Sequence, residues 1–258
     1  MRIRTAAVVL GTAAALSVLA VPAASADTAK AATIGKVVIN GGKPIVLGTA
    51  NKTFTASLTA SDDSGIALAG IAFLHNAAGD ELETTDADPV CKAVNSTTST
   101  CTVTFKVNAK RDLGSNAAAG TWYAYGVVIP KDADLDTGAG VVSKDKAATT
   151  KVLRATKLTV NAAPEPVKKG KTLTVTGSLT RADWKTAKYT AFVGQKAVLQ
   201  FRKAGTTKFV NVKTVTSSKT GALKTTVKAA KDGYWRYVYT GSTTTAAVSA
   251  AADYVDVK

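Results

Sequence analysis

The chain has 258 residues, with 33 Lys and Arg against 18 Asp and Glu, and a formal net charge of +15. One His and two Cys are too few ligands for a zinc site of the usual spacing. The sequence contains no glycine-rich phosphate loop of the Walker or dinucleotide type, which argues against a nucleotide-dependent enzyme.

Residues 1–26 have the features of a secretory signal peptide. Arg2 and Arg4 precede an apolar run over residues 6–21, and residues 24–26 supply small side chains at a cleavage position. The run is shorter than the roughly 18 residues that a membrane-spanning helix needs, and Pro22 follows it. We therefore expect a secreted chain, extracellular or associated with the cell wall, without a transmembrane anchor.

Residues 27–155 are predicted to form an all-β domain, because helix signals are sparse and short alternating runs recur between Gly, Asp and Asn clusters. In residues 52–59 the alternation places Phe54, Ala56 and Leu58 on one face. About seven such runs, separated by turn signals at regular spacing, are typical of an antiparallel β-sandwich. The expected strands include 37–39, 52–59, 71–75, 101–107, 120–129 and 151–154.

The two cysteines of the chain, Cys91 and Cys101, flank a short polar loop. In an exported protein this spacing predicts a disulfide that closes a small loop. Such a closure contributes roughly 2 to 3 kcal/mol in the loop-entropy model. The alternative is a metal site that combines the two thiols with His75.

Residues 156–258 are predicted to form a second, basic β-sandwich that repeats the order of the first. The segment 52–55 (KTFT) matches 171–174 (KTLT), and 120–122 (GTW) matches 233–235 (GYW), which suggests an internal duplication. In the strand expected after Gly233, Trp235, Tyr237 and Tyr239 lie two residues apart, so the three rings share one face and form a core. No flexible linker separates the domains, so we expect them to stack end to end.

Residues 156–258 resemble the immunoglobulin-like repeats of secreted actinobacterial proteins. The resemblance rests on 167–170 (VKKG), 175–177 (VTG), Tyr189, 194–195 (GQ), 201–202 (FR) and 232–236 (DGYWR). It implies an immunoglobulin-like sandwich and an extracytoplasmic role, and it transfers no catalytic residues. The predicted architecture is therefore two tandem immunoglobulin-like antiparallel β-sandwiches after a cleaved signal peptide.

The two halves of the mature chain differ in charge. Residues 27–155 contain 13 Lys and Arg against 13 Asp and Glu, whereas residues 156–258 contain 18 against 5. This excess raises the local concentration of anionic partners, such as cell-wall or other extracellular polymers, around the second domain. The alternative is that Lys keeps a secreted domain soluble and protects its exposed strand edges.

A long loop predicted between the second and third strands of the basic domain is the candidate ligand-binding site. Trp184 and Tyr189 would offer flat ring faces to sugars or bases. Arg181, Lys185 and Lys188 would supply positive charge to phosphate or carboxylate groups. The alternative is that the aromatic rings cap the open end of the sandwich.

The stretch from Asp132 to Gly138 is the candidate metal site. Carboxylates at alternate positions, Asp132, Asp134 and Asp136, could converge on calcium as in the first half of an EF-hand loop. Thr137 replaces the expected turn glycine, and Ser143 stands where a closing Glu is required. The alternative is a plain turn, and we expect no other cofactor.

Catalytic groups are few. His75 is the one imidazole, the sequence has no Gly-x-Ser-x-Gly elbow, and the acidic residues at 80–88 are interpreted as a solvated face. We therefore expect a non-enzymatic secreted protein that binds or decorates the cell envelope or an extracellular anionic polymer through its basic domain. Two alternatives remain open. The chain is an inhibitor whose partner is an extracellular enzyme, or it is a secreted hydrolase.

Overall fold

The computed structural model describes residues 31–85 and 87–258. The expected signal peptide, residues 1–26, lies outside these ranges, and so does Asp86. The described residues form nineteen strands and three short helical turns. No helix in this part of the chain has the length and apolar character needed to cross a membrane. The helical turns are η1 (Asn40–Gly42), η2 (Ala109–Leu113) and η3 (Asn116–Ala118).

Strands β1 to β9 form the first sandwich, which has two facing sheets. The first sheet has the order β1-β3-β7-β6 and is antiparallel. The second has the order β2-β9-β8-β4-β5 and is antiparallel except for the parallel pair β2 and β9. The strands are β1 (Thr33–Ile39), β2 (Ile45–Leu47), β3 (Lys52–Ser61), β4 (Ile66–Asn76), β5 (Glu81–Glu83), β6 (Val90–Ala93), β7 (Thr98–Val107), β8 (Gly120–Pro130) and β9 (Val142–Arg154).

Strands β10 to β19 form the second sandwich. In one sheet β12 pairs with β10, β11, β13 and β16. In the other the order is β15-β14-β17, with β18 and β19 on the far edge of β17. The strands are β10 (Thr156–Leu158), β11 (Asn161–Ala163), β12 (Thr172–Asp183), β13 (Lys188–Ala191), β14 (Lys196–Lys203), β15 (Val210–Thr216), β16 (Ala222–Lys228), β17 (Gly233–Tyr239), β18 (Val248–Ser249) and β19 (Asp253–Val255).

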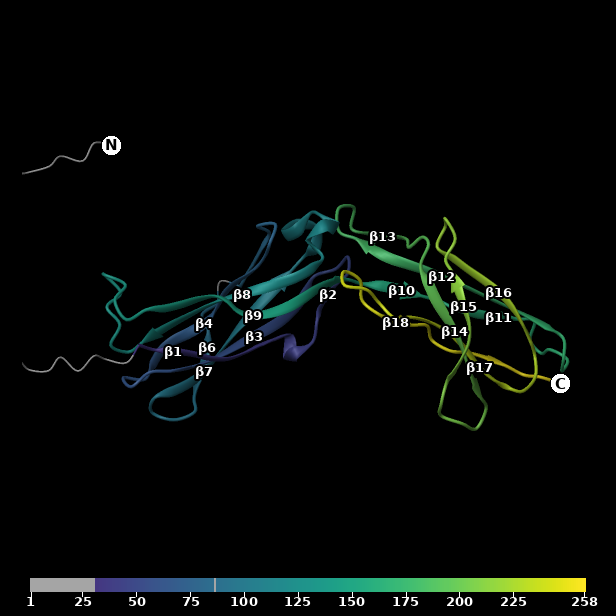
Figure 1. Cartoon of the computed structure of the whole chain (residues 1–258), viewed down its shortest axis with the longest axis horizontal. Coiled ribbons are helices and arrows are strands. Elements are labelled where there is room, and N and C mark those ends of the chain that lie inside the picture. Colours follow the sequence, from purple (N-terminus) through teal and green to yellow (C-terminus); the bar gives the residue numbers. More distant parts are fainter. Residues whose placement is uncertain (1–30, 86) are drawn as a thin grey trace, which may run out of the picture.

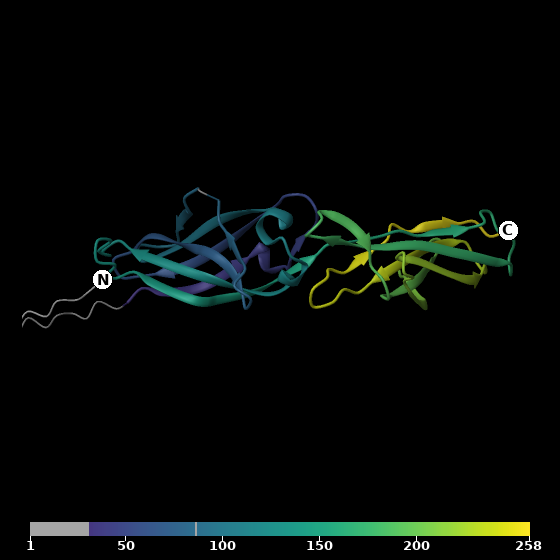
Figure 2. The same ribbon diagram turned by 90° about the horizontal axis from the view of Figure 1, so that it is seen from above.

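The strand order identifies both sandwiches as immunoglobulin-like. In that fold the strands A, B, E and D form one sheet and C, F and G the other, with further strands added at the C edge. The first sandwich follows this order when β1, β3, β7 and β6 are taken as A, B, E and D. The second follows it when β12 and β16 are taken as B and E, with β10 and β11 as A, and β14 and β17 as C and F, with β18 and β19 as G. The predicted fold class is therefore confirmed, and Figures 1 and 2 show the two sandwiches in line, end to end.

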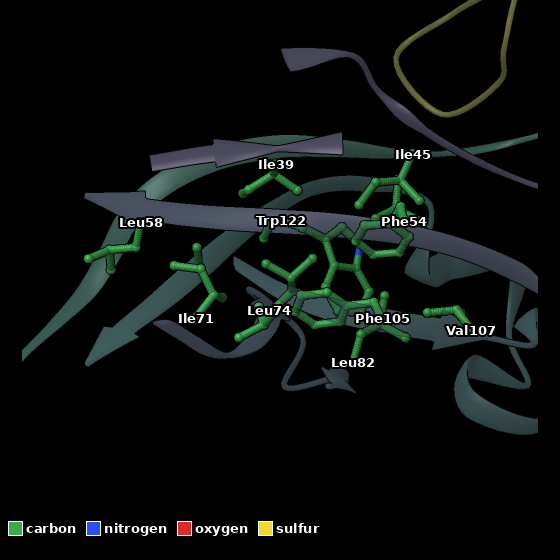
Figure 3. Packing of buried hydrophobic residues seen from close by; sticks show 14 of the residues in the cluster. Ile39, Ile45, Phe54, Leu58, Ile71, Leu74, Leu82, Phe105, Val107 and Trp122 are labelled. Atoms are coloured by element: carbon green, nitrogen blue, oxygen red, sulfur yellow. The ribbon is translucent and has the colours of Figure 1, made fainter. Parts of the chain in front are cut away.

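Alternation of apolar residues builds the first core. On β3 and β7 the inward residues come from every second position, and the rings of Phe54 and Phe105 stack with centroids 4.9 Å apart. Trp122 on β8 is fully buried, and its Nε1 donates a hydrogen bond to the carbonyl oxygen of Ala118 at 2.8 Å. Figure 3 shows these rings among Leu58, Leu74 and other aliphatic side chains. The interior is therefore closed by large side chains from both sheets.

The aromatic strand expected at the centre of the second sandwich is β17. Its residues Trp235, Tyr237 and Tyr239 all face the core, as predicted. The hydroxyl of Tyr237 donates to the carbonyl oxygen of Val175 at 3.0 Å, and burial raises the pKa of this phenol to about 12. The matched segments at 52–55 and 171–174 lie at the start of β3 and β12. The two Gly-x-Trp segments begin β8 and β17.

The predicted disulfide is confirmed. Cys91 on β6 and Cys101 on β7 are directly opposed in the antiparallel pair, and their sulfur atoms are 2.02 Å apart. No free cysteine remains in the described residues. The alternative metal site that uses both thiols is therefore excluded by the bond between them.

Candidate binding surfaces

The segment predicted as a long ligand-binding loop is a β-hairpin at the joint between the sandwiches. β12 continues to Asp183, which pairs with Lys188 at the start of β13. The turn of this hairpin reaches the end of the first sandwich, near β2 (Figure 1). The expected loop is therefore part of the contact between the two sandwiches.

The expectation that Trp184 offers its ring to a ligand is wrong. Its ring is 1% exposed and packs in the core of the first sandwich, although it follows a strand of the second. Its Nε1 donates to the carbonyl oxygen of Leu47 at 3.1 Å, and its backbone N–H donates to Oδ1 of Asn116 at 2.9 Å. Both N–H donors of the buried residue are thus satisfied by the neighbouring sandwich, as burial requires.

Arg154, the last residue of β9 in the first sandwich, forms hydrogen bonds to residues of the second sandwich. Its side chain is 7% exposed, and its Nε donates to the carbonyl oxygen of Ala182 at 2.7 Å. Its backbone N–H bonds to Thr244, and its carbonyl accepts from Ala246. Burial, with the nearby positive charge of Arg181, lowers the pKa of Arg154 to about 10. The guanidinium is therefore still charged at neutral pH, so its hydrogen bonds are charge-assisted.

The other predicted loop residues divide between the joint and the surface. Tyr189 is half-buried against the first core, and the Nζ atom of Lys157 lies 4.1 Å from its ring centre. Arg181 stacks on Phe192 at 4.0 Å and donates to Oγ1 of Thr245 at 3.1 Å. Only Lys185 and Lys188 are exposed, and their role in ligand binding stays a prediction.

The structure does not bring Asp132, Asp134 and Asp136 together as calcium ligands. The Asp134 carboxylate accepts hydrogen bonds from the Thr137 hydroxyl at 2.7 Å and from the backbone N–H groups of Asp136 and Thr137, and these bonds lower its pKa. Asp132 accepts from the Ser64 hydroxyl at 2.8 Å. Residues 31–85 and 87–258 contain no group of three or more His, Cys, Asp or Glu placed to hold a metal. The stretch is a turn closed by Asp134.

His75 lies on β4 in a small surface cluster. Its Nε2 is 2.6 Å from Oδ1 of Asp145 on β9. Its ring lies 5.9 Å from that of Phe73 and 5.7 Å from that of Tyr123. The nearby acidic residue Asp80 accepts from the Asn76 amide, which closes the turn after β4. The His75–Asp145 contact therefore spans β8, which lies between β4 and β9 in the sheet, and the Asp80 contact closes a turn.

Sequence reasoning missed a row of arginine and aromatic side chains on the outer face of the sheet β15-β14-β17-β19. We call it the arginine–aromatic face. The Cζ atom of Arg236 lies 3.8 Å from the ring centre of Phe209, and that of Arg202 lies 5.3 Å from the same ring. Arg202 also lies 4.0 Å from the ring centre of Tyr234. The row ends where Tyr234 meets Tyr254, with ring centres 5.1 Å apart.

Neutral neighbours hold the two guanidinium groups. Arg236 donates through Nε to Oε1 of Gln200 at 2.9 Å, and Arg202 donates to the carbonyl oxygen of Thr206 at 2.6 Å. The ion pairs among the described residues are His75–Asp145, Arg111–Asp112 and Lys258–Asp256, so neither arginine of the face has an acidic partner there. Both positive charges are therefore fixed in place without a counter-ion from the described chain.

No protein-family model matches the chain, and no curated protein sequence matches it. It is similar to the solved structure of dimeric latent PorU from Porphyromonas gingivalis, with 15% identity and a TM-score of 0.29 over 92% of this chain and 21% of that one. The chain thus spans about a fifth of PorU.

Two further solved structures are similar. The mouse nectin-like molecule 4 ectodomain has 13% identity and a TM-score of 0.27, over 86% of this chain and 64% of that one. The D0-D1 domain of intimin has 11% identity and a TM-score of 0.28, over 86% and 98%. The class of the protein rests on its own strand order: it is an all-β chain of two tandem immunoglobulin-like sandwiches.

Proposed function

We propose that the chain is a non-enzymatic extracellular protein that binds an anionic polymer of the cell envelope or its surroundings. In this proposal residues 1–26 are removed on secretion, and the mature chain consists of two domains, residues 27–155 and 156–258. The resemblance to repeats of secreted actinobacterial proteins supports the same location.

The charge of the second sandwich is the observation that carries the proposal. Residues 156–258 contain 18 Lys and Arg against 5 Asp and Glu, while residues 27–155 are balanced. Exposed lysines occur on both of its sheets, for example Lys196 on β14 and Lys224 on β16. A positive electrostatic potential attracts polyanions and raises their local concentration near the domain. Salt screens this attraction.

The joint supports a role as a two-domain unit displayed in one orientation. Trp184 and Arg154 connect the neutral first sandwich to the basic second one through buried contacts. A buried contact of this kind restricts relative domain motion. The neutral sandwich then acts as a spacer that holds the basic sandwich in a fixed direction.

Binding of the mature chain to immobilised polymers tests the proposal. Polygalacturonate, heparin and lipoteichoic acid serve as anionic probes, and dextran serves as the neutral control. We expect retention on at least one anionic probe at about 50 mM salt and its loss near 1 M, where the Debye length falls to roughly 3 Å. Equal retention on dextran, or none on any anionic probe at low salt, would contradict the proposal.

A further inference from the structure

The arginine–aromatic face, formed by Arg202, Phe209, Tyr234, Arg236 and Tyr254, differs from the lysine-covered surface of β16 in the same sandwich. Most charges of the second sandwich are lysines on flexible stems, whereas the two arginines here lie against ring faces. Stacking on aromatic faces orders the planar guanidinium group before any partner arrives. Preorganised groups lose less conformational entropy on binding.

The opposite sheet of the same sandwich shows the contrast. Its outer face carries threonines of β12 beside the exposed lysines Lys224 and Lys228 of β16. Lys224 lies opposite Thr176, and Lys228 lies opposite Thr172, whose hydroxyl accepts from the lysine Nζ at 3.4 Å. The β12–β16 part of this sheet provides positive charge without aromatic rings, whereas Tyr189 on β13, with Lys157 at 4.1 Å, lies at the joint. The exposed lysines of β16 therefore lack the ring contacts that order Arg202 and Arg236.

The strand register explains why the face points outward. On β17 the inward positions hold Trp235 and Tyr237, so Tyr234 and Arg236 must face away from the core. Across the pair with β14, Arg202 lies opposite Tyr234 and Gln200 lies opposite Arg236. Phe209 comes from the segment before β15 and completes the row between the two arginines.

We propose that the arginine–aromatic face is a binding site for an acidic polysaccharide, a chain of sugar rings that carry carboxylates. The free N–H edges of a guanidinium match a carboxylate in a two-point hydrogen bond. Tyr254, which is 42% exposed, offers an amphipathic ring that suits the mixed polar and apolar surface of a sugar. This inference rests on the proposed function and assigns its site and ligand class.

A single-stranded nucleic acid fits the face less well. Such chains use several free ring faces on which successive bases stack. Here the Phe209 ring has a guanidinium at 3.8 Å and another at 5.3 Å, and Tyr234 is stacked by Arg202. The rings therefore order the arginines, and Tyr254 is the ring that remains most open to a ligand.

The test compares two double variants of the mature chain by titration with polygalacturonate. Arg202→Lys with Arg236→Lys keeps the net charge but removes the planar groups, and we expect affinity to fall about tenfold or more. Lys224→Gln with Lys228→Gln removes two charges from the opposite sheet, and we expect a loss of about twofold or less, as for peripheral charges. Tyr254→Ala, a substitution at an exposed position, should weaken binding about threefold.

The possible outcomes distinguish failure of the assigned site from failure of the proposed function. Unchanged affinity of the arginine variant, with far-ultraviolet circular dichroism and Tm like the parent, would overturn the assigned site and leave the proposed function standing. Stronger competition by an oligothymidylate than by polygalacturonate would overturn the ligand class. If the parent chain binds no anionic polymer, the proposed function fails together with this inference.

Discussion

At the scale of single residues, Trp184 shows how a side chain can belong to one sandwich in sequence and to the other in packing. Its ring sits in the first core, and its two donors bond to Leu47 and Asn116 of the first sandwich. The sequence around it is polar, with Asp183 before it and Lys185 after it, so it has the appearance of an exposed loop. The two residues to which it donates hydrogen bonds lie 68 and 137 positions away.

Trp184→Ala should therefore cost about 3 to 5 kcal/mol, the range for truncation of a buried tryptophan. Trp122→Ala and Trp235→Ala should cost a similar amount because both rings are buried in their own cores. Denaturant melts of the three variants measure this. A loss below about 1 kcal/mol for the Trp184 variant, which is usual for surface substitutions, would show that the ring does not hold the joint.

At the scale of elements, the alternating strands could be predicted and the joint hairpin could not. The residues 52–59 and 101–107 alternate strictly, and both form strands, β3 and β7, with the expected faces inward. β17 was predictable for the same reason. The β12–β13 hairpin lacks such a pattern because its burial comes from the first sandwich, a contact distant in sequence.

The arginine–aromatic face was only partly predictable. Alternation along β17 places Tyr234 and Arg236 opposite the buried Trp235 and Tyr237, and this signal is present in the sequence. The stacking of Phe209 between Arg202 and Arg236 depends on the path of the segment before β15. No local pattern specifies that path, so the site requires the tertiary structure.

The β6–β7 hairpin carries the disulfide, and its removal should destabilise the first sandwich. Replacing Cys91 by Ser and Cys101 by Ala removes a cross-link of sequence separation 10, which contributes roughly 2 to 3 kcal/mol in the loop-entropy model. Hydrogen exchange should accelerate in β6 and β7 and remain unchanged in β14 and β17. Unchanged exchange throughout, with unchanged global stability, would contradict this role of the bond.

At the scale of the whole molecule, the two sandwiches are joined by side chains from both sides. Trp184 reaches from the second into the first, and Arg154 at the end of β9 bonds to residues of the second. The joint and the arginine–aromatic face use different parts of the second sandwich, the β12–β13 hairpin and the β14–β17 pair (Figures 1 and 2). We therefore expect binding at the face to leave the joint contacts in place.

The Nε–Hε signals of the arginines distinguish the arginine–aromatic face from the rest of the chain. Residues 27–258 contain five arginines, Arg111, Arg154, Arg181, Arg202 and Arg236, and each has a distinct environment. In a nitrogen–proton correlation spectrum of the mature chain, polygalacturonate should shift the Nε–Hε signals of Arg202 and Arg236 and leave those of Arg154 and Arg181 unchanged. Shifts confined to the other arginines, or binding with none of the five signals moved, would show that the polymer does not bind at the arginine–aromatic face.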